Sequence, residues 1–269
     1  MIFSQNISPV LMSLFATLFT WFVTALGAST VFFFKNINHK VLNTMLGFAA
    51  GVMIAASFWS LLQPAIERSS QSALPQWLVP TLGFISGALF LWMSDKIVTK
   101  ARNKFSDTNK SNDRLSRIIM LIFSITLHNI PEGLAVGVAF GALNKDNISP
   151  VALMSAVSVA VGIGLQNFPE GAAVSIPLRR EGLSRKKCFL IGQASGTVEP
   201  IAGVLGALLA VYVESLLPFA LSFAAGAMIL VAVHELIPEC QSNKDVYPYI
   251  STMGIISGFS LMMLLDVML

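Results

Sequence analysis

The chain has 269 residues, of which 55% are hydrophobic and only 12% are charged, and its mean hydropathy is +0.73. This composition excludes an ordinary soluble domain and indicates a membrane protein. The net charge of +3 gives no reason to expect nucleic-acid binding.

Polar clusters and Pro or Gly residues divide the chain into apolar segments, each long enough to cross a bilayer as a helix of about 20 residues. Eight such segments are predicted, at residues 8–34, 40–66, 74–94, 117–142, 149–177, 187–213, 217–239 and 248–269. Four of the loops between them are short, and the longest is expected from Lys96 to about Arg117. The predicted fold is an all-α membrane protein with one domain, residues 1–269.

The basic residues predict how these segments are oriented. When alternate loops are assigned to the same side, fifteen of the 17 Lys and Arg residues fall together, and only Arg68 and Lys145 lie opposite. Positively charged loops stay in the cytoplasm, so both termini are expected outside. Without an organelle signal, the default location is the cell membrane, taken as a bacterial inner membrane. The sequence contains no GxxxxGK[ST] loop, so an ion gradient rather than ATP is expected to drive any transport.

Two nearly identical hexapeptides lie in the fourth and fifth segments, HNIPEG at 128–133 and QNFPEG at 166–171. Helix residues three and four apart share a face, so the first hexapeptide presents its polar residues together, namely His128, Asn129 and Glu132. The second repeats the arrangement with Gln166, Asn167 and Glu170. At a rise of about 1.5 Å per residue, both hexapeptides lie about 15 Å deep, near the bilayer midplane. Consecutive antiparallel helices should place them side by side.

Three carboxylates at membrane depth have no basic residue to neutralise them. Glu199, next to Pro200 in the sixth segment, joins Glu132 and Glu170, and no Lys or Arg lies at a comparable depth. A structural ion pair is therefore excluded, which leaves protonated carboxyls or a bound cation. Pro131 would also free a helix carbonyl for coordination, or would only kink the helix.

The second and seventh segments add further candidate ligands. Met53 offers a thioether at mid-membrane depth, with plain core packing as the alternative. Glu235 is a further acidic candidate, and His234 beside it is a candidate ligand, a proton acceptor or a buried core histidine. Small residues at four-residue spacing indicate close helix packing or a smooth sliding surface, and these are Gly133, Gly137, Gly141, Gly47, Gly51, Gly254 and Gly258.

An imidazole combined with carboxylate and amide oxygens suits Zn²⁺ and also Fe²⁺, Mn²⁺, Co²⁺ and Cd²⁺. These residues favour a carrier that moves such an ion into the cytoplasm. A proton-coupled cation exchanger would use the same buried acids and is the alternative. An intramembrane metal-dependent hydrolase is disfavoured, because Pro238 stands where the helical zinc-protease motif starting at His234 needs a second His. We therefore do not expect an enzyme.

These motifs, together with Arg179-Arg180-Glu181-Gly182 and Glu199-Pro200, resemble those of the ZIP (Zrt-, Irt-like) family of divalent metal transporters. The resemblance spans all eight segments and is greatest to the bacterial GufA-type branch. It implies a 3 + 2 + 3 arrangement, in which the first three and last three helices form an inverted repeat around the fourth and fifth. It also implies that a transport bundle moves against a scaffold, and it makes a homodimer an expectation.

The resemblance further implies how the candidate residues divide between two metal sites. The primary site would consist of His128, Glu132, Gln166, Glu170 and Met53. A second site would use Asn129, Asn167 and Glu199, with Glu132 and Glu170 bridging, and the release path would be lined by His234 and Glu235. Asn167 stands where some relatives have Asp, which removes one negative charge from the second site. The transported metal is the substrate, and no cofactor is implied.

Overall fold

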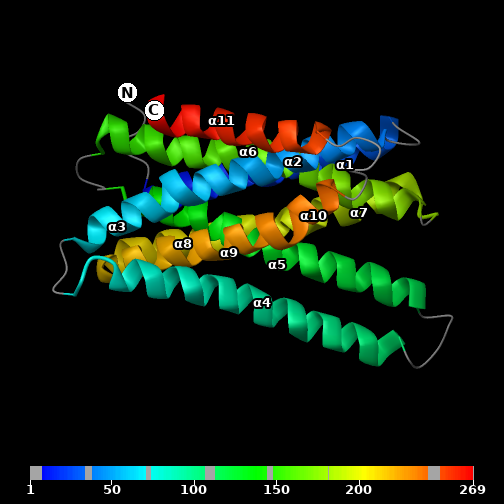
Figure 1. Cartoon of the computed structure of the whole chain (residues 1–269), viewed down its shortest axis with the longest axis horizontal. Helices are drawn as coiled ribbons and strands as arrows, with labels where there is room; N and C mark the ends of the chain where they lie inside the picture. The colour runs from blue at the N-terminus through cyan, green and yellow to red at the C-terminus, as the bar shows by residue number, and fades with distance from the viewer. Residues whose placement is uncertain are drawn as a thin grey trace.

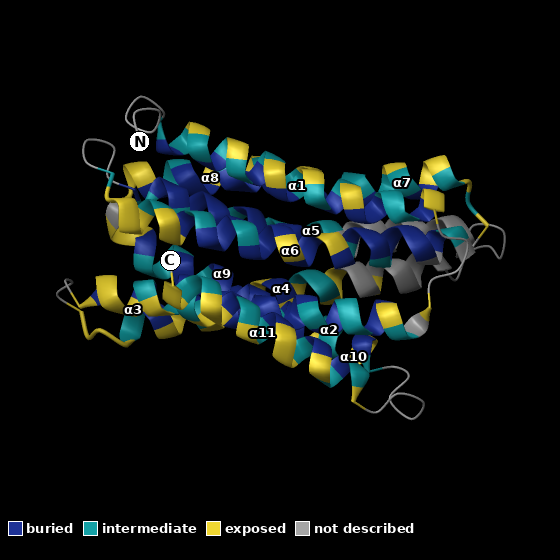
Figure 2. Ribbon diagram, turned by 90° about the horizontal axis from the view of Figure 1, so that it is seen from above, coloured by how far each residue is buried: buried dark blue, intermediate teal, exposed yellow. Residues whose placement is uncertain are grey.

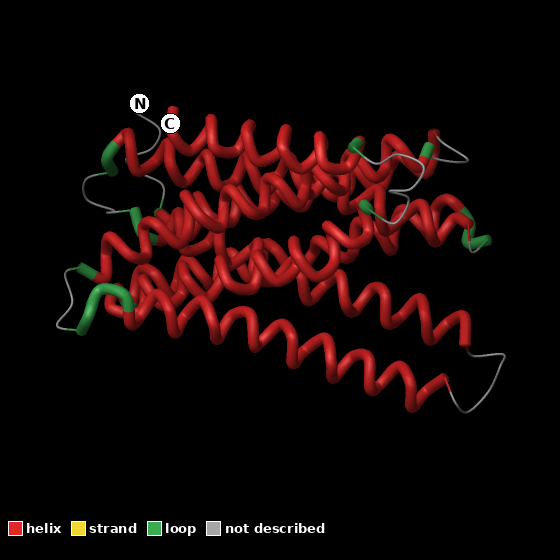
Figure 3. The backbone as a smooth tube through the Cα atoms, viewed as in Figure 1, coloured by secondary structure: helices red, strands yellow, loops and turns green. Residues whose placement is uncertain are grey.

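The computed structural model describes residues 8–33, 38–70, 74–106, 113–143, 148–180, 182–241 and 249–268. Within these ranges every regular element is a helix (Figure 3). The helices run along one common axis, and the first described helix begins at the same end of the bundle at which the last one ends (Figure 1). The predicted all-α architecture is confirmed. Four residues of the charge count fall outside the described ranges, namely Lys35, Lys110, Lys145 and Lys244.

Each predicted segment corresponds to one helix or to a short series of helical elements. The unbroken helices are α1 (Pro9–Phe33), α4 (Leu78–Ser106), α5 (Asp113–Gly141), α6 (Pro150–Arg180) and α11 (Ile250–Met268). The second segment consists of α2 (His39–Ala56), the π-helix η1 (Ser57–Leu62) and α3 (Gln63–Ser69).

The sixth and seventh segments are also interrupted. The sixth contains α7 (Arg185–Ala194), the 3₁₀-helix η2 (Ser195–Thr197) and α8 (Val198–Tyr212). The 3₁₀-helix η3 (Glu214–Leu216) leads to the seventh, which contains α9 (Leu217–Val231), the π-helix η4 (Ala232–Leu236) and α10 (Ile237–Cys240). Both π-helices end just before a proline, Pro64 or Pro238, which cannot donate the hydrogen bond that a regular helix requires.

The loop expected from Lys96 to about Arg117 is wrong in its extent. Helix α4 continues to Ser106 and α5 begins at Asp113, so both helices project beyond their apolar segments. The stretch 95–106 contains neither Gly nor Pro, and its Lys and Arg residues are good helix formers. Helix propensity therefore extends α4 past the region that hydropathy identifies.

Seven helical spans among the described residues are long and apolar enough to cross a membrane. They are Pro9–Phe33, Lys40–Ser69, Leu78–Ile97, Pro150–Ile176, Arg185–Tyr212, Leu217–Cys240 and Ile250–Met268. Helix α5, which carries the first hexapeptide, is not among the seven. The seven spans by themselves make the protein a multi-pass membrane protein.

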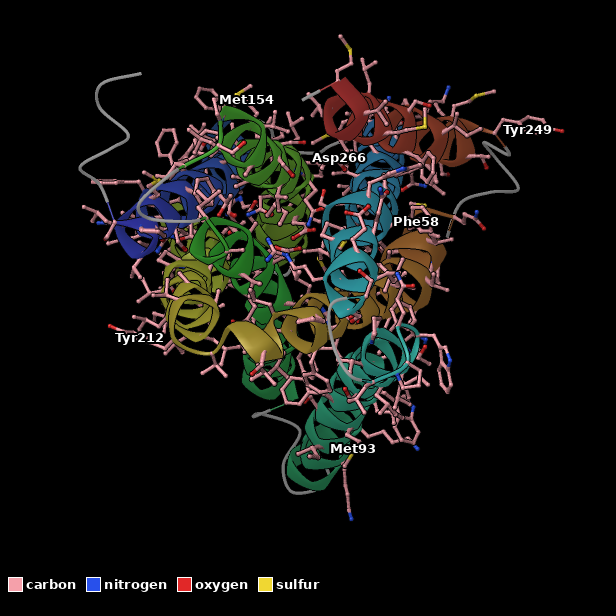
Figure 4. The ribbon with its side chains drawn as sticks, turned by 90° about the vertical axis from the view of Figure 1, so that its left-hand side faces the viewer. Phe58, Met93, Met154, Tyr212, Tyr249 and Asp266 are labelled. Carbon is pink, nitrogen blue, oxygen red and sulfur yellow. The ribbon has the colours of Figure 1, made fainter. Side chains whose placement is uncertain are left out.

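The helices form two bundles. Contacts are most extensive between α1 and α6, α5 and α8, α2 and α11, and α4 and α9. The first two pairs, with α7, form what we call the hexapeptide bundle, and the last two, with α3 and α10, form the flanking bundle. Figures 2 and 4 show the two bundles side by side, seen from two directions.

Glycine residues hold each of these four pairs at short distance. A Cβ atom added to Gly137 of α5 would overlap the main chain of α8, and one added to Gly171 of α6 would overlap that of α1. In the flanking bundle, a Cβ atom on Gly258 of α11 would overlap the main chain of α2, and one on Gly87 of α4 would overlap that of α9. The close-packing interpretation of the spaced glycines is confirmed. The sliding-surface interpretation is wrong, because the predicted glycine rows lie inside each bundle and not between the two.

An apolar core joins the two bundles. It includes Val52 and Ala56 of α2, Val136 of α5, Ile163 of α6 and Met228 of α9, all buried. On the outside of the molecule, large apolar side chains face outward, as Met93 and Tyr212 do in Figure 4. Helix surfaces of this kind are suited to contact with lipid.

Candidate metal site

The two hexapeptides bring their polar side chains together on the facing helices α5 and α6. His128, Asn129 and Glu132 are buried on α5, and Gln166 and Asn167 are fully buried on α6. Glu170, one turn after Gln166, is partly buried. Gln166 Nε2 donates a hydrogen bond of 2.6 Å to Glu132 Oε1, which joins the two helices at this level. We call these six residues the polar centre.

Glu199 reaches the polar centre from α8. The 3₁₀-helix η2 separates α7 from α8, so Glu199 lies in the first turn of α8, where it is fully buried. Asn167 Nδ2 donates to its Oε2 over 2.8 Å, and Asn129 Nδ2 donates to its Oε1 over 3.4 Å. The sixth segment therefore contributes a carboxylate beside both hexapeptides.

Two threonines of α1, which are not among the residues predicted above, also contact Glu199. Thr20 Oγ1 donates to Glu199 Oε2 over 2.5 Å, and Thr24 Oγ1 donates to Oε1 over 3.4 Å. Both belong to a row of small polar residues on α1 that includes Ser13 and Thr17 and is buried throughout. Such a row, at helical spacing in an otherwise apolar segment, is the sequence pattern that indicates a buried polar face on α1.

Glu235 contacts His128 across the boundary between the bundles. Glu235 Oε1 lies 2.8 Å from His128 Nε2, and their side chains are 34% and 10% exposed. Glu235 lies in the π-helix η4, and such one-turn insertions redirect side chains at functional sites. The neighbouring His234 is exposed, so the structure does not bring it to His128 together with Glu235.

Met53 occupies a different environment from the polar residues. Its side chain is fully buried in the apolar core that joins the bundles, on the helix that begins at His39. Membership of this core agrees with the packing role given above as the alternative, and the role of its thioether as a ligand stays a prediction.

Several buried oxygen atoms in the polar centre have no hydrogen-bond partner. They are Asn129 Oδ1, Glu132 Oε2, Gln166 Oε1, Asn167 Oδ1 and Glu170 Oε1. An unpaired buried acceptor is unfavourable by about 1–3 kcal/mol, and more when it is charged. All five are acceptors, so a cation is the species that would satisfy them together.

Carboxylate and imidazole groups alone do not complete this site. In the part of the chain that the structure describes, no three His, Cys, Asp or Glu side chains form a group that could hold a metal ion. His128, Glu132 and Glu170, as placed in this structure, do not form such a group by themselves. The amide of Gln166 lies beside Glu132, so the polar centre also offers an amide oxygen, and its mixture of nitrogen and oxygen donors suits Zn²⁺ and related ions.

A cavity of about 110 Å³ adjoins the polar centre. His128, Asn129 and Glu170 line its inner wall, and Glu235 also borders it. Its other lining residues are Leu46 of α2, Ala173 and Val174 of α6, Val231 of α9 and Leu236 of η4. These lie toward the end of the molecule where α2 begins and α6 ends.

Comparison with known proteins gives a consistent result. A family model described as ZIP zinc transporter matches residues 7–117 and 106–266. The zinc transporter ZIP11 of Xenopus tropicalis is 39% identical over 333 aligned positions, covering 97% of this chain and 98% of that protein. The zinc transporter GufA of Myxococcus xanthus is 32% identical, covering 95% and 98%. The zinc transporter ZIPB of Bordetella bronchiseptica is 33% identical, covering 90% and 76%.

Proposed function

Because the chain belongs to the ZIP zinc transporter family, we propose that it carries Zn²⁺ into the cytoplasm through the polar centre on α5 and α6. The protein is a membrane transporter of divalent metal ions and not an enzyme. The hydrolase alternative, based on the stretch that starts at His234, is therefore dropped.

The observation that carries this proposal is the group of five unpartnered oxygen atoms next to an imidazole. In a membrane interior, such a group is stable only when a cation or protons neutralise it. We assign His128, Glu132, Gln166 and Glu170 as the ligands of the transported ion. Fe²⁺, Mn²⁺, Co²⁺ and Cd²⁺ fit the same donor set and are expected as further substrates.

The cavity beside the polar centre supports release on the cytoplasmic side. It extends from His128 and Glu170 past Glu235 toward the basic ends of the helices. By the positive-inside rule that end faces the cytoplasm, with both chain termini outside. Glu235 contacts Nε2 of His128, the imidazole nitrogen that a metal ion would use. The contact between Glu235 and this nitrogen and the binding of a metal ion to it therefore exclude each other.

The packing of the helices supports the inverted repeat and the eight-span topology that we propose. Helix α1 packs on α6 as α8 packs on α5, and α2 packs on α11 as α9 packs on α4. A two-fold axis that exchanges the first three segments with the last three, and the fourth with the fifth, would convert each of these pairs into the other. The hexapeptide bundle would then move against the flanking bundle, in one domain that spans residues 1–269.

We place the protein in the cell membrane, in bacteria the inner membrane, as a homodimer without a bound cofactor. An existing gradient of the metal ion or the membrane potential drives uptake. Proton exchange is the alternative coupling, because the carboxylates of the centre could carry protons on the return step. Uptake that requires an opposing proton gradient would favour the exchanger.

The test is uptake of Zn²⁺ into proteoliposomes that contain a fluorescent zinc indicator. We expect saturable uptake by the wild type and loss of uptake in Glu170→Gln, which removes a ligand charge but keeps the side-chain size. Glu67→Gln is the matched control, because Glu67 is exposed at the outer end of α3. Normal uptake by Glu170→Gln would contradict the site, and no uptake of Zn²⁺, Fe²⁺, Mn²⁺ or Cd²⁺ would contradict transport.

A further inference from the structure

Both oxygens of the Glu199 carboxylate have hydrogen-bond donors. Its Oε2 accepts from Thr20 Oγ1 and Asn167 Nδ2, and its Oε1 accepts from Thr24 Oγ1 and Asn129 Nδ2. The contacts to Oε2 are short, whereas both contacts to Oε1 are 3.4 Å long, and the single hydrogen of the Thr24 hydroxyl is shared with the Thr20 carbonyl at 3.3 Å. In contrast to Glu132 and Glu170, Glu199 leaves no carboxylate oxygen unpartnered.

The surroundings of Asn167 determine which way its amide points. Its Nδ2 lies 2.8 Å from Glu199 Oε2 and 3.2 Å from the main-chain oxygen of Thr20. The main-chain oxygen of Thr20 and the ionised carboxylate of Glu199 can only accept hydrogen bonds, so the amino group faces them and Oδ1 faces away. Oδ1 is one of the buried oxygens without a partner.

The same arrangement holds on α5. Asn129 donates from Nδ2 to Glu199 Oε1, and its Oδ1 is buried and unpartnered. Glu199 thus holds the amino groups of two asparagines, one from each hexapeptide, and both amide oxygens are left for another ligand. An ion bound directly to Glu199 would have to displace hydrogen-bond donors, whose positive ends repel a cation.

We propose that Glu199 is a positioning residue, held by Thr20 and Thr24, which turns the amide oxygens of Asn129 and Asn167 toward the single transported ion, as oxygen ligands in addition to the four side chains assigned above. The centre then binds one ion per chain. This inference rests on the proposed function and differs from the second metal site that the family resemblance implies for Glu199. Thr20 acts only through Glu199 and the amides, and it does not touch the ion.

The first experiment counts bound metal. Purified full-length protein in detergent is dialysed against Zn²⁺, and the zinc per chain is measured by mass spectrometry for the wild type and Glu199→Gln. We expect one ion per chain in both, with weaker binding in the variant. Two ions in the wild type that fall to one in Glu199→Gln would overturn the inference.

The second experiment isolates the positioning role. Thr20→Val keeps the side-chain shape but removes the hydroxyl, and we expect its Kd for Zn²⁺ to rise about three- to tenfold by calorimetry. Thr20→Ser should restore wild-type affinity. Thr30→Val is the matched control, because the Thr30 hydroxyl bonds only within α1, to the Gly27 carbonyl.

An unchanged Kd in Thr20→Val would overturn the inference. So would loss of the ion in Glu199→Gln with normal binding in Thr20→Val, because Glu199 would then be a ligand. Both experiments measure binding, whereas the proposed function is tested by uptake. Two bound ions with normal uptake would therefore overturn this inference alone, and the absence of uptake with one bound ion would overturn transport alone.

Discussion

His128 is the imidazole donor in a centre otherwise composed of carboxylate and amide oxygens. Oxygen donors alone suit hard ions such as Mg²⁺ and Mn²⁺, whereas an imidazole nitrogen favours Zn²⁺. The contact of His128 with Glu235 also shows that its Nε2 is directed toward the cavity and the other bundle. The identity of this one side chain therefore bears on which metal is carried.

We expect His128→Gln to lower the ratio of zinc to manganese uptake by about tenfold or more, because an oxygen replaces the nitrogen donor. Competitive uptake of the two ions in proteoliposomes measures the ratio. The same change at His234 should leave it unaltered, because that side chain is exposed and does not line the cavity. A ratio unchanged by His128→Gln would remove the imidazole from the site.

Besides the apolar core, the carboxyl group of Asp266 links the hexapeptide bundle to the flanking bundle outside the polar centre. Asp266 of α11 accepts a hydrogen bond of 2.9 Å from Ser158 of α6, and one of 2.8 Å from Ser60 of η1. In Figure 4 Asp266 lies where α6, α2 and α11 meet. Ser158 joins the two bundles through this contact, and Ser60 joins elements of the flanking bundle alone.

Ser158→Ala should therefore favour opening of the outer side by about two- to tenfold, the effect of one lost hydrogen bond. The rate at which an impermeant thiol reagent labels Ala160→Cys from outside measures this opening, in protein with Cys188 and Cys240 replaced by Ser. Ala160 is buried on α6 between Ser158 and the polar centre.

The control is Ser60→Ala, which removes a hydrogen bond to the same carboxyl group but within one bundle. It should leave the labelling rate of Ala160→Cys unchanged. Equal rates in Ser158→Ala and Ser60→Ala would show that the contact with Asp266 does not hold the bundles together.

Across the molecule, the distribution of basic residues and the direction of the cavity both indicate the same end as the cytoplasmic one. The cavity extends toward the end of the molecule that carries most of the basic residues, and the apolar core lies between the bundles. An ion bound at His128 is thus nearer to exit on the side that we assign to the cytoplasm.

This orientation predicts the outcome of labelling in intact cells. Gln76→Cys, at the exposed turn before α4, should react with an impermeant thiol reagent, and Lys186→Cys, on α7, should react only after the membrane is permeabilised. Both are made in protein without Cys188 and Cys240. Labelling of Lys186→Cys in intact cells, with Gln76→Cys protected, would reverse the topology and the proposed direction of transport.

The helical architecture and the polar centre could be predicted from the sequence because both follow from short-range patterns. Hydropathy over about 20 residues identifies a membrane helix, and spacing of three or four residues puts polar groups on one face. His128, Glu132, Gln166 and Glu170 were found in this way. Hydropathy does not predict the extension of α4 to Ser106, because residues 95–106 are mostly polar but still favour a helix.

Which distant residues meet depends on how the helices pack in three dimensions. Thr20 bonds Glu199 although 179 positions separate them, and Glu235 reaches His128 from the other bundle. Such contacts depend on which helices pair and on how each is rotated about its axis. Close approach at the glycines and one extra residue in a π-turn set that rotation, and neither effect follows from the hydropathy of any single segment.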